Sequence, residues 1–427
     1  MTRILYNLLI ILMLFAYCGS DSDYKQQATS EINEQYTEDL VSLDLAFGSE
    51  KYGTKNEFLL VDPDPSPFQL LVNNNEDILL VDEWSIKIFD KNGIGKKILG
   101  RPGYGPGEFE DSPDIFLGPT GYLLALTSGM SDRALYNFYA PDYSYIDKIR
   151  IQNNQRILDY VQSKVPDIKS YRIRQIIPLN ETEKIYRINY RDIEPIEWMV
   201  SVLYENTDGV IELLNFKRPD SFTSHNLTTY GEIFGSLILD IIPGRRLVYI
   251  NTDDDRHDEQ TGSFYYIHIV SLDTREDKII TRKFDAYEYK EELFEDILQV
   301  KRQKNEEEHH KEAVKFFKKN KFYPSIKRMK IDGHYVFIEQ YTSLYSNIKE
   351  NKWAMAIDIF DLETGKFIKQ VIFPIYLLGK TIKNGYLYGT FQERDESGEL
   401  DFPELRKYKI NPVVYGLPED PDWKKKK

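Results

Sequence analysis

The chain has 427 residues, which is enough for one large domain or two of ordinary size. Aromatic residues make up 14% of it, and such a composition favours strands and broad packed faces. Its 55 Lys and Arg residues stand against 69 Asp and Glu residues, so the net charge is -14. This balance argues against general nucleic-acid binding, which needs a basic surface to displace counterions.

The first 17 residues predict a signal peptide. Arg3 supplies a positive start, and Ile4–Tyr17 is an apolar run too short for a spanning helix, which needs about 20 residues. Cys18 is the only cysteine, and polar Gly19–Asp23 follows it directly. The arrangement resembles a bacterial lipoprotein signal, in which the cysteine becomes the lipidated first residue. An ordinary secretory signal with an incidental cysteine is the alternative.

Residues 18–39 are polar and acidic, and we interpret them as a tether between a lipid anchor and the folded body. We therefore expect a protein of the bacterial cell envelope that reaches the membrane through this anchor. The outer membrane is the expected site, on its periplasmic or its surface face. A single cysteine also excludes an intramolecular disulfide, so the fold has to be stabilised by packing.

Residues 40–415 predict an all-β, six-bladed β-propeller with four-stranded antiparallel blades, followed by a C-terminal tail at 416–427. The pattern of strand, Asx or Gly turn, and strand recurs every 40–60 residues or so, which is typical of propellers. The six units cover about 67–107, 113–150, 157–217, 220–284, 322–373 and 374–412. The first five units show four strand-like runs each, but unit six shows only three, the first at Tyr376–Lys380. The lone apolar alternation at Leu40–Phe47 is predicted to close the last blade as its fourth strand.

Residues 84–122 contain the clearest boundary between two units. Asp90-Lys91-Asn92-Gly93 is a turn between two strand-like runs, and Gly100–Gly107 then leads to the next unit. These glycines lack both the G-x-G-x-x-G spacing and the Gly-Lys-Ser/Thr ending of phosphate loops, and a strand follows them in place of a helix. We interpret them as the crossing between two blades.

One segment departs from the β pattern. Residues 286–320 are highly charged, and Phe294, Ile297 and Leu298 share one helical face. We predict a helical insert here, between blades four and five.

Three segments carry a resemblance to a known family: Ile86–Gly93, Gly103–Phe109 and Phe322–Ile326. They resemble the NHL-like six-bladed β-propeller lipoproteins of diderm bacteria, over about residues 40–412. The resemblance implies the fold and an envelope location. It carries no catalytic residue, because the family has no common enzyme signature.

The sequence contains only weak signals of metal binding or catalysis. Asp253–Asp255 with His257 and Asp258 could collect calcium, but they lack the glycine and the glutamate of an EF-hand loop, so a solvated hairpin tip is favoured. His309 and His310 belong to no His-Glu-x-x-His motif, and no serine lies in a G-x-S-x-G elbow. No catalytic residue and no cofactor is predicted.

Aromatic residues near expected strand ends offer a platform for a glycan or a peptide, although packing between blades also consumes large rings. The candidates are Trp84, Tyr122, Tyr139, Tyr249, Tyr265, Tyr341, Tyr345 and Tyr386.

The leading hypothesis is an envelope-anchored, non-catalytic propeller that binds a protein, peptide or glycan partner. The alternative is a metal-dependent six-bladed hydrolase or lactonase, which would hold a divalent ion in its central channel. Asp82, Asp240 and Glu339 are its candidate ligands, although the sequence does not show whether they converge. A purely structural scaffold is the third reading.

Overall fold

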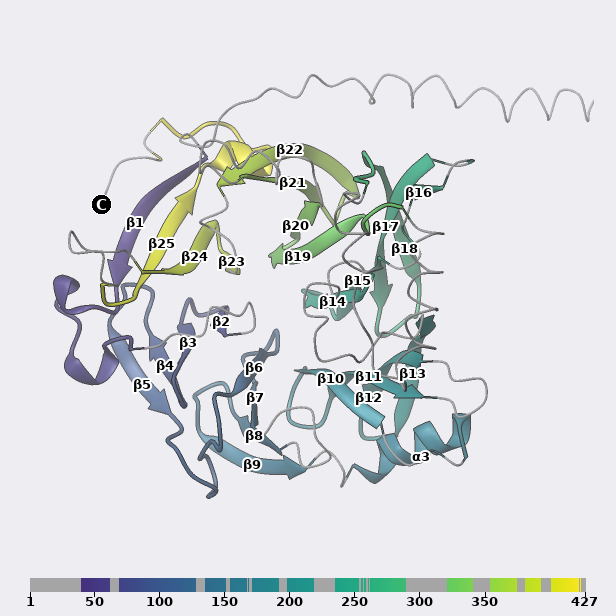
Figure 1. Ribbon diagram of the computed structural model, residues 1–427, viewed down its shortest axis with the longest axis horizontal. Coiled ribbons are helices and arrows are strands. Elements are labelled where there is room, and N and C mark those ends of the chain that lie inside the picture. The colour runs from purple at the N-terminus through teal and green to yellow at the C-terminus, as the bar shows by residue number, and fades with distance from the viewer. Residues whose placement is uncertain are drawn as a thin grey trace, which may run out of the picture. The chain divides into compact units, whose positions relative to one another are not determined.

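The computed structural model describes residues 40–61, 69–127, 135–150, 154–166, 168, 171–191, 198–218, 235–252, 255, 257–258, 260, 262–288, 321–340, 354–374, 381–392, 401–421 and 423. All of them belong to one compact unit, residues 37–427. Six antiparallel sheets form a ring in this unit, which confirms the predicted six-bladed β-propeller (Figure 1). The expected signal peptide and tether, residues 1–39, lie outside the described residues.

The first three blades follow the chain in order. Blade 1 consists of β2 (Leu70–Val72), β3 (Ile78–Asp82), β4 (Ser85–Phe89) and β5 (Gly95–Leu99). Blade 2 consists of β6 (Asp114–Leu117), β7 (Leu123–Thr127), β8 (Leu135–Tyr139) and β9 (Tyr145–Arg150). Blade 3 consists of β10 (Tyr171–Pro178), β11 (Lys184–Arg191), β12 (Trp198–Glu205) and β13 (Val210–Arg218).

The last three blades complete the ring. Blade 4 contains β14 (Leu237–Ile242), β15 (Arg246–Asn251), β17 (Gly262–Ser271) and β18 (Asp277–Lys283), with β16 (His257–Asp258) paired to β17. Blade 5 contains β19 (Ile326–Asp332), β20 (Tyr335–Gln340), β21 (Ala354–Asp361) and β22 (Lys366–Pro374). Blade 6 contains β23 (Thr381–Lys383), β24 (Tyr386–Phe391), β25 (Glu404–Ile410) and β1 (Val41–Phe47).

Strand β1 pairs with β25, so the predicted closure of the last blade by an N-terminal strand is confirmed. Two other details differ from the prediction or lie beyond the described residues. The first strand of blade 6 is β23, later in the chain than the predicted run at 376–380, which lies outside the described residues. Of the predicted helical insert only 286–288 are described, without helix, and 289–320 lie outside.

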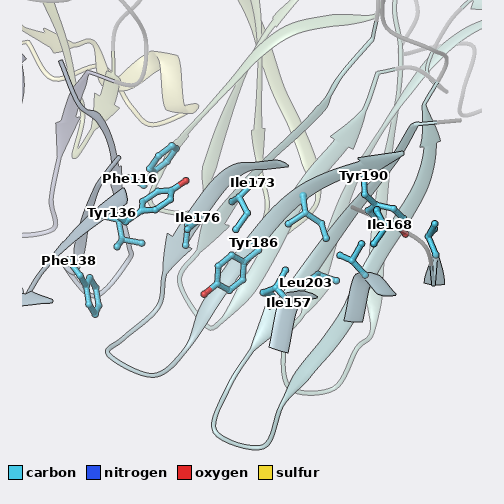
Figure 2. Close-up of a cluster of buried hydrophobic side chains, with 14 residues drawn as sticks. Phe116, Tyr136, Phe138, Ile157, Ile168, Ile173, Ile176, Tyr186, Tyr190 and Leu203 are labelled. Carbon is cyan, nitrogen blue, oxygen red and sulfur yellow. The ribbon is translucent and has the colours of Figure 1, made fainter. Parts of the chain in front are cut away.

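The helix α3 (Gln155–Lys164), between blades 2 and 3, was not predicted. The side chain of Asn154 caps it by accepting from the backbone N–H of Ile157. Ile157 and Val161, one turn apart, are fully buried among side chains of blades 2 and 3 (Figure 2). Its apolar residues are confined to 157–161, and so short a run gave too weak a periodicity to separate this helix from the following strand.

Each blade packs on both of its faces. In β3, Leu79 and Val81 join a cluster with blade 2, whereas Ile78 and Leu80 join a cluster with blade 6. Six such apolar clusters lie between the six neighbouring pairs of blades. Burial on both faces explains why many of these strands are continuously apolar in sequence, where a half-exposed strand would alternate.

The two faces of the ring differ in the length of their connections. Adjacent strands run antiparallel, so turns between first and second strands lie on the same face as turns between third and fourth strands. All of these are two to five residues long, and we call this the short-turn face. The opposite, long-connection face carries the remaining connections, which run from six to 42 residues except for the turn Glu83-Trp84.

Candidate functional site

The glycine-rich loop connects β5 with β6 and is the crossing from blade 1 to blade 2, as predicted. The carboxylate of Glu108 folds back onto it and accepts hydrogen bonds from the N–H of Gly105 at 2.7 Å and from Nε of Arg101 at 2.8 Å. These donors hold the pKa of Glu108 below its usual range. The loop therefore binds a carboxylate of its own chain.

Asp82, the first candidate metal ligand, forms structural contacts with other residues of the chain at blade 1. Its side chain is buried, forms an ion pair with Nζ of Lys87 at 2.5 Å, and accepts from the N–H of Val61 at 3.1 Å. Lys87 also donates to the carbonyl of Leu59. These contacts attach the connection from blade 6 to the end of β3.

Asp240 and Glu339, the other two candidates, lie on β14 of blade 4 and β20 of blade 5, and both act on Lys330 of β19. Burial and, less strongly, the positive charge of Arg328 lower the pKa of Lys330 to about 8, against the two carboxylates, which act to raise it. Burial in turn raises the pKa of Asp240, which its hydrogen bond from Ile241 and the nearby lysines offset in part. The structure brings these two carboxylates to one lysine, while Asp82 lies in another blade.

Within the described residues, no three side chains of His, Cys, Asp or Glu come together as metal ligands. His268 stacks on Tyr249 with ring centroids 4.4 Å apart, and its Nδ1 lies 2.8 Å from a carboxylate oxygen of Asp277. Asp255, at the acidic hairpin, is buried and accepts from the N–H of Tyr266 at 3.2 Å. Cys18, Asp253, Asp254, His309 and His310 lie outside the described residues, as do the side chains of His257 and Asp258.

Most of the aromatic candidates serve packing. Tyr139, Tyr249 and Tyr265 are buried, and Tyr122 stacks on Phe138 at 5.5 Å between ring centroids. The half-buried ring of Tyr386 lies under Nζ of Lys407 at 4.0 Å from its centroid, and Tyr341 and Tyr345 lie outside the described residues. Trp84 is the exception, since 47% of it is exposed.

In the described connections between strands, the exposed large apolar side chains lie on the long-connection face, except for Ile94 in the turn between β4 and β5. Besides Trp84 they include two residues that the sequence reading did not single out, Tyr104 (79% exposed) and Phe402 (60% exposed). Tyr52 and Val61 on the connection from blade 6 to blade 1 are also exposed. Each of the five lies between two strands at their long-connection ends. Exposure of large rings at loop tips is a feature that an apolar count of the sequence does not reveal.

Charged residues on the first strands of the blades are the second feature that the sequence reading missed. These strands lie nearest the axis of the ring (Figure 1). Their cations are Arg172, Arg174, Lys327, Arg328, Lys330 and Lys383, whereas their acidic residues are Asp114, Asp240 and Asp332. An excess of cations here contrasts with the net charge of -14 of the whole chain. We call Arg328, Lys330 and Lys383 the axial basic cluster.

Two further polar networks tie blades together. Asp358 of blade 5 is completely buried and accepts from the hydroxyl of Tyr265 in blade 4 at 2.8 Å, and from the side-chain amides of Gln340 at 2.6 Å and Gln370 at 2.9 Å. Arg282 approaches the same carboxylate to 3.3 Å. A buried carboxylate with this many donors is satisfied, and we assign the network to stability between the blades.

The other network joins blades 3 and 4 at the short-turn face. Glu183 accepts a bidentate pair of hydrogen bonds from Arg245 at 2.9 and 3.0 Å, together with one from the hydroxyl of Tyr204. The donors lower the pKa of Glu183 to about 2.

Comparison with known proteins shows no family for this chain. No family model and no curated protein matches the sequence. A candidate exported protein of Bacteroides fragilis has a similar structure, with a TM-score of 0.43 and 12% identity over 88% of this chain and 97% of that one. A chain of the mitotic checkpoint complex gives a TM-score of 0.35 and 8% identity over 82% of this chain and 92% of that one. Similarity at this level transfers no function.

No helix in the described part of the chain is long and apolar enough to cross a membrane.

Proposed function

We propose that the protein is a non-catalytic β-propeller that binds a partner protein, peptide or glycan through its long-connection face. The difference between the two faces carries this proposal. One face is made of turns of two to five residues, whereas the connections of six residues or more, and the exposed rings of Trp84, Tyr104 and Phe402, belong to the other. Binding residues generally lie on loops that a rigid scaffold positions, and exposed aromatic side chains are enriched at binding surfaces.

We further propose that the chain is an NHL-like lipoprotein of the bacterial envelope, anchored through Cys18. The apolar run before Cys18 and the polar segment after it support this assignment. Labelling with a radioactive fatty acid tests it: the wild-type chain should incorporate label, and Cys18→Ala should not. Equal labelling of both chains would remove the anchor from the proposal.

The hydrolase alternative requires acidic ligands that converge near the axis. Asp82 is engaged by Lys87 in blade 1, and Asp240 lies among lysines. Asp240 and Glu339 both act on Lys330, and among the described residues no group of three His, Cys, Asp or Glu side chains could hold a metal ion, so binding is the function that we favour.

Site-specific photo-crosslinking in native envelopes tests the assignment of the binding face. A photoreactive residue is placed at Trp84, Tyr104 or Phe402 on the long-connection face. Matched positions are Ile94, Asp208 and Thr364, which are exposed in turns of the short-turn face.

We expect a discrete crosslinked product from at least one long-connection position and none from the matched positions. Crosslinks to the same product with equal yield from both faces would contradict the proposal, as would products from the short-turn face alone.

A further inference from the structure

The axial basic cluster spans two neighbouring blades. Arg328 and Lys330 lie on β19, the first strand of blade 5, and Lys383 lies on β23, the first strand of blade 6. The two strands are in contact along the ring. All three side chains are half-buried, so they are partly removed from water and still accessible to it.

Within the described residues, none of these three side chains makes a hydrogen bond or an ion pair. Asp240 influences Lys330 and Lys383 electrostatically, yet its own close contact is the N–H of Ile241 at 2.7 Å. Other partly or fully buried cations of the propeller do have carboxylate partners, as in the pairs Lys87–Asp82, Arg245–Glu183 and Arg282–Asp358. The axial basic cluster therefore has more positive charge than its surroundings compensate.

Uncompensated positive charge at a partly buried position is unfavourable, and it makes Lys330 easier to deprotonate. Burial and the charge of Arg328 lower the pKa of Lys330 to about 8, although Asp240 and Glu339 act to raise it. Lys383, on the adjacent strand, adds a third positive charge near Asp240. An anion placed among these groups would relieve the repulsion and restore the protonated form.

We propose that the axial basic cluster binds the anionic group of a small ligand, either a carboxylate or a phosphate. The inference deepens the proposed binding function and rests on it. Three cations on two adjacent strands, with Asp240 and Glu339 acting on Lys330, match a single anionic group in size better than an extended polymer. The net charge of -14 repels anions from the rest of the surface, so the cluster would also select its ligand by charge.

Isothermal titration calorimetry on the full-length chain tests the proposal, with citrate as the carboxylate probe and pyrophosphate as the phosphate probe. Arg328→Gln and Lys383→Met each remove one charge of the cluster. Lys366→Met removes the same charge from an exposed position on β22, the outer strand of blade 5, and is the matched control.

We expect at least one probe to bind, and to bind about tenfold or more weakly to each cluster variant, since charge-assisted hydrogen bonds contribute on this scale. The control should bind as the wild type does. Binding of citrate alone identifies a carboxylate ligand, and binding of pyrophosphate alone a phosphate ligand. Absence of binding of both probes at about 10 mM, or equal binding by the cluster variants and the control, would overturn the proposal.

Two further measurements each have an expected direction, of the change in affinity or of the proton transfer, that unspecific binding would not produce. Asp240→Asn removes the competing carboxylate, so it should tighten binding of the anion; weaker binding would contradict the proposal. At pH 8, binding should take up as much as about half a proton, because Lys330 becomes fully protonated. Lys330→Met should abolish this uptake, measured as the dependence of the binding heat on the ionisation enthalpy of the buffer.

These outcomes are separate from those of the crosslinking experiment. Loss of anion binding with intact crosslinks from Trp84, Tyr104 or Phe402 would overturn the axial site alone. Anion binding without any discrete crosslink would instead contradict the partner surface on the long-connection face.

Discussion

The buried hydroxyl of Tyr265 provides a direct test of how blades 4 and 5 are held together. Tyr265 is fully buried, and its hydroxyl donates to the carboxylate of Asp358 at 2.8 Å. The substitution Tyr265→Phe removes this one donor and leaves the packing of the ring in place. A hydrogen bond to a charged group contributes about 1.5–3 kcal/mol, so we expect a loss of that size in the free energy of unfolding.

Tyr388 is the matched control for this substitution. It is equally buried, but its hydroxyl has no hydrogen-bond partner among the described residues. Tyr388→Phe should therefore change the free energy of unfolding by less than about 0.5 kcal/mol, or stabilise the protein slightly. For a folded body of this size, the loss in Tyr265→Phe corresponds to a decrease of about 2–4 °C in the Tm.

Urea unfolding measures both variants, with a shift of the midpoint at constant slope as the expected result for Tyr265→Phe. The penalty should also depend on pH. Burial raises the pKa of Asp358, whereas the hydroxyl of Tyr265 lowers it, so the variant leaves the ionised carboxylate less stabilised. A group with a raised pKa in the folded state costs stability as the pH rises above its unfolded pKa of about 3.9. The penalty should therefore be larger at pH 7 than at pH 4, and equal penalties in the two tyrosine variants would refute the reasoning.

Three further predictions concern the body of the propeller. Glu183→Gln should lower stability by about 1 kcal/mol at pH 7, because its partner Arg245 is partly exposed. Its lowered pKa makes this difference disappear as the pH falls from about 4.5 towards 2, which thermal unfolding at a series of pH values would show. Phe47→Ala should cost about 3–5 kcal/mol in urea unfolding, because Phe47 of β1 packs on Phe89 of blade 1 at 4.9 Å between ring centroids; a change below 1 kcal/mol or so would contradict closure through this contact. Gly100→Ala should destabilise more than Gly333→Ala, since both have positive φ but only at Gly100 would the added Cβ lie 2.1 Å from a ring atom of Phe109; equal Tm values would exclude this steric cause.

Much of the fold could be predicted from the sequence, because propeller blades repeat a local pattern. The turn at 90–93 was predicted between two strand-like runs, and the structure places it between β4 and β5, the third and fourth strands of blade 1. The glycine-rich crossing at 100–107 was assigned correctly for a similarly local reason, since its spacing fits no phosphate loop and a strand follows it.

The candidate site was harder to predict from the sequence, because it depends on which residues meet across blades. Asp82 was a candidate ligand for a metal ion in the central channel, but Lys87 of blade 1 and the N–H of Val61 engage its carboxylate. The electrostatic interaction of Asp240 with Lys330 and Lys383 joins residues about 90 and 140 positions apart in the chain, and no spacing rule relates them.

The sequence alone determined the all-β class, the six units and the closing strand at its start, since alternation, turn residues and repeat length act over a few neighbouring residues. Only the tertiary structure decided which charges share the axis, which rings are exposed and which face carries the long connections. These properties arise when six blades pack in a ring, because packing brings together strands that are distant in the chain and buries both faces of each blade.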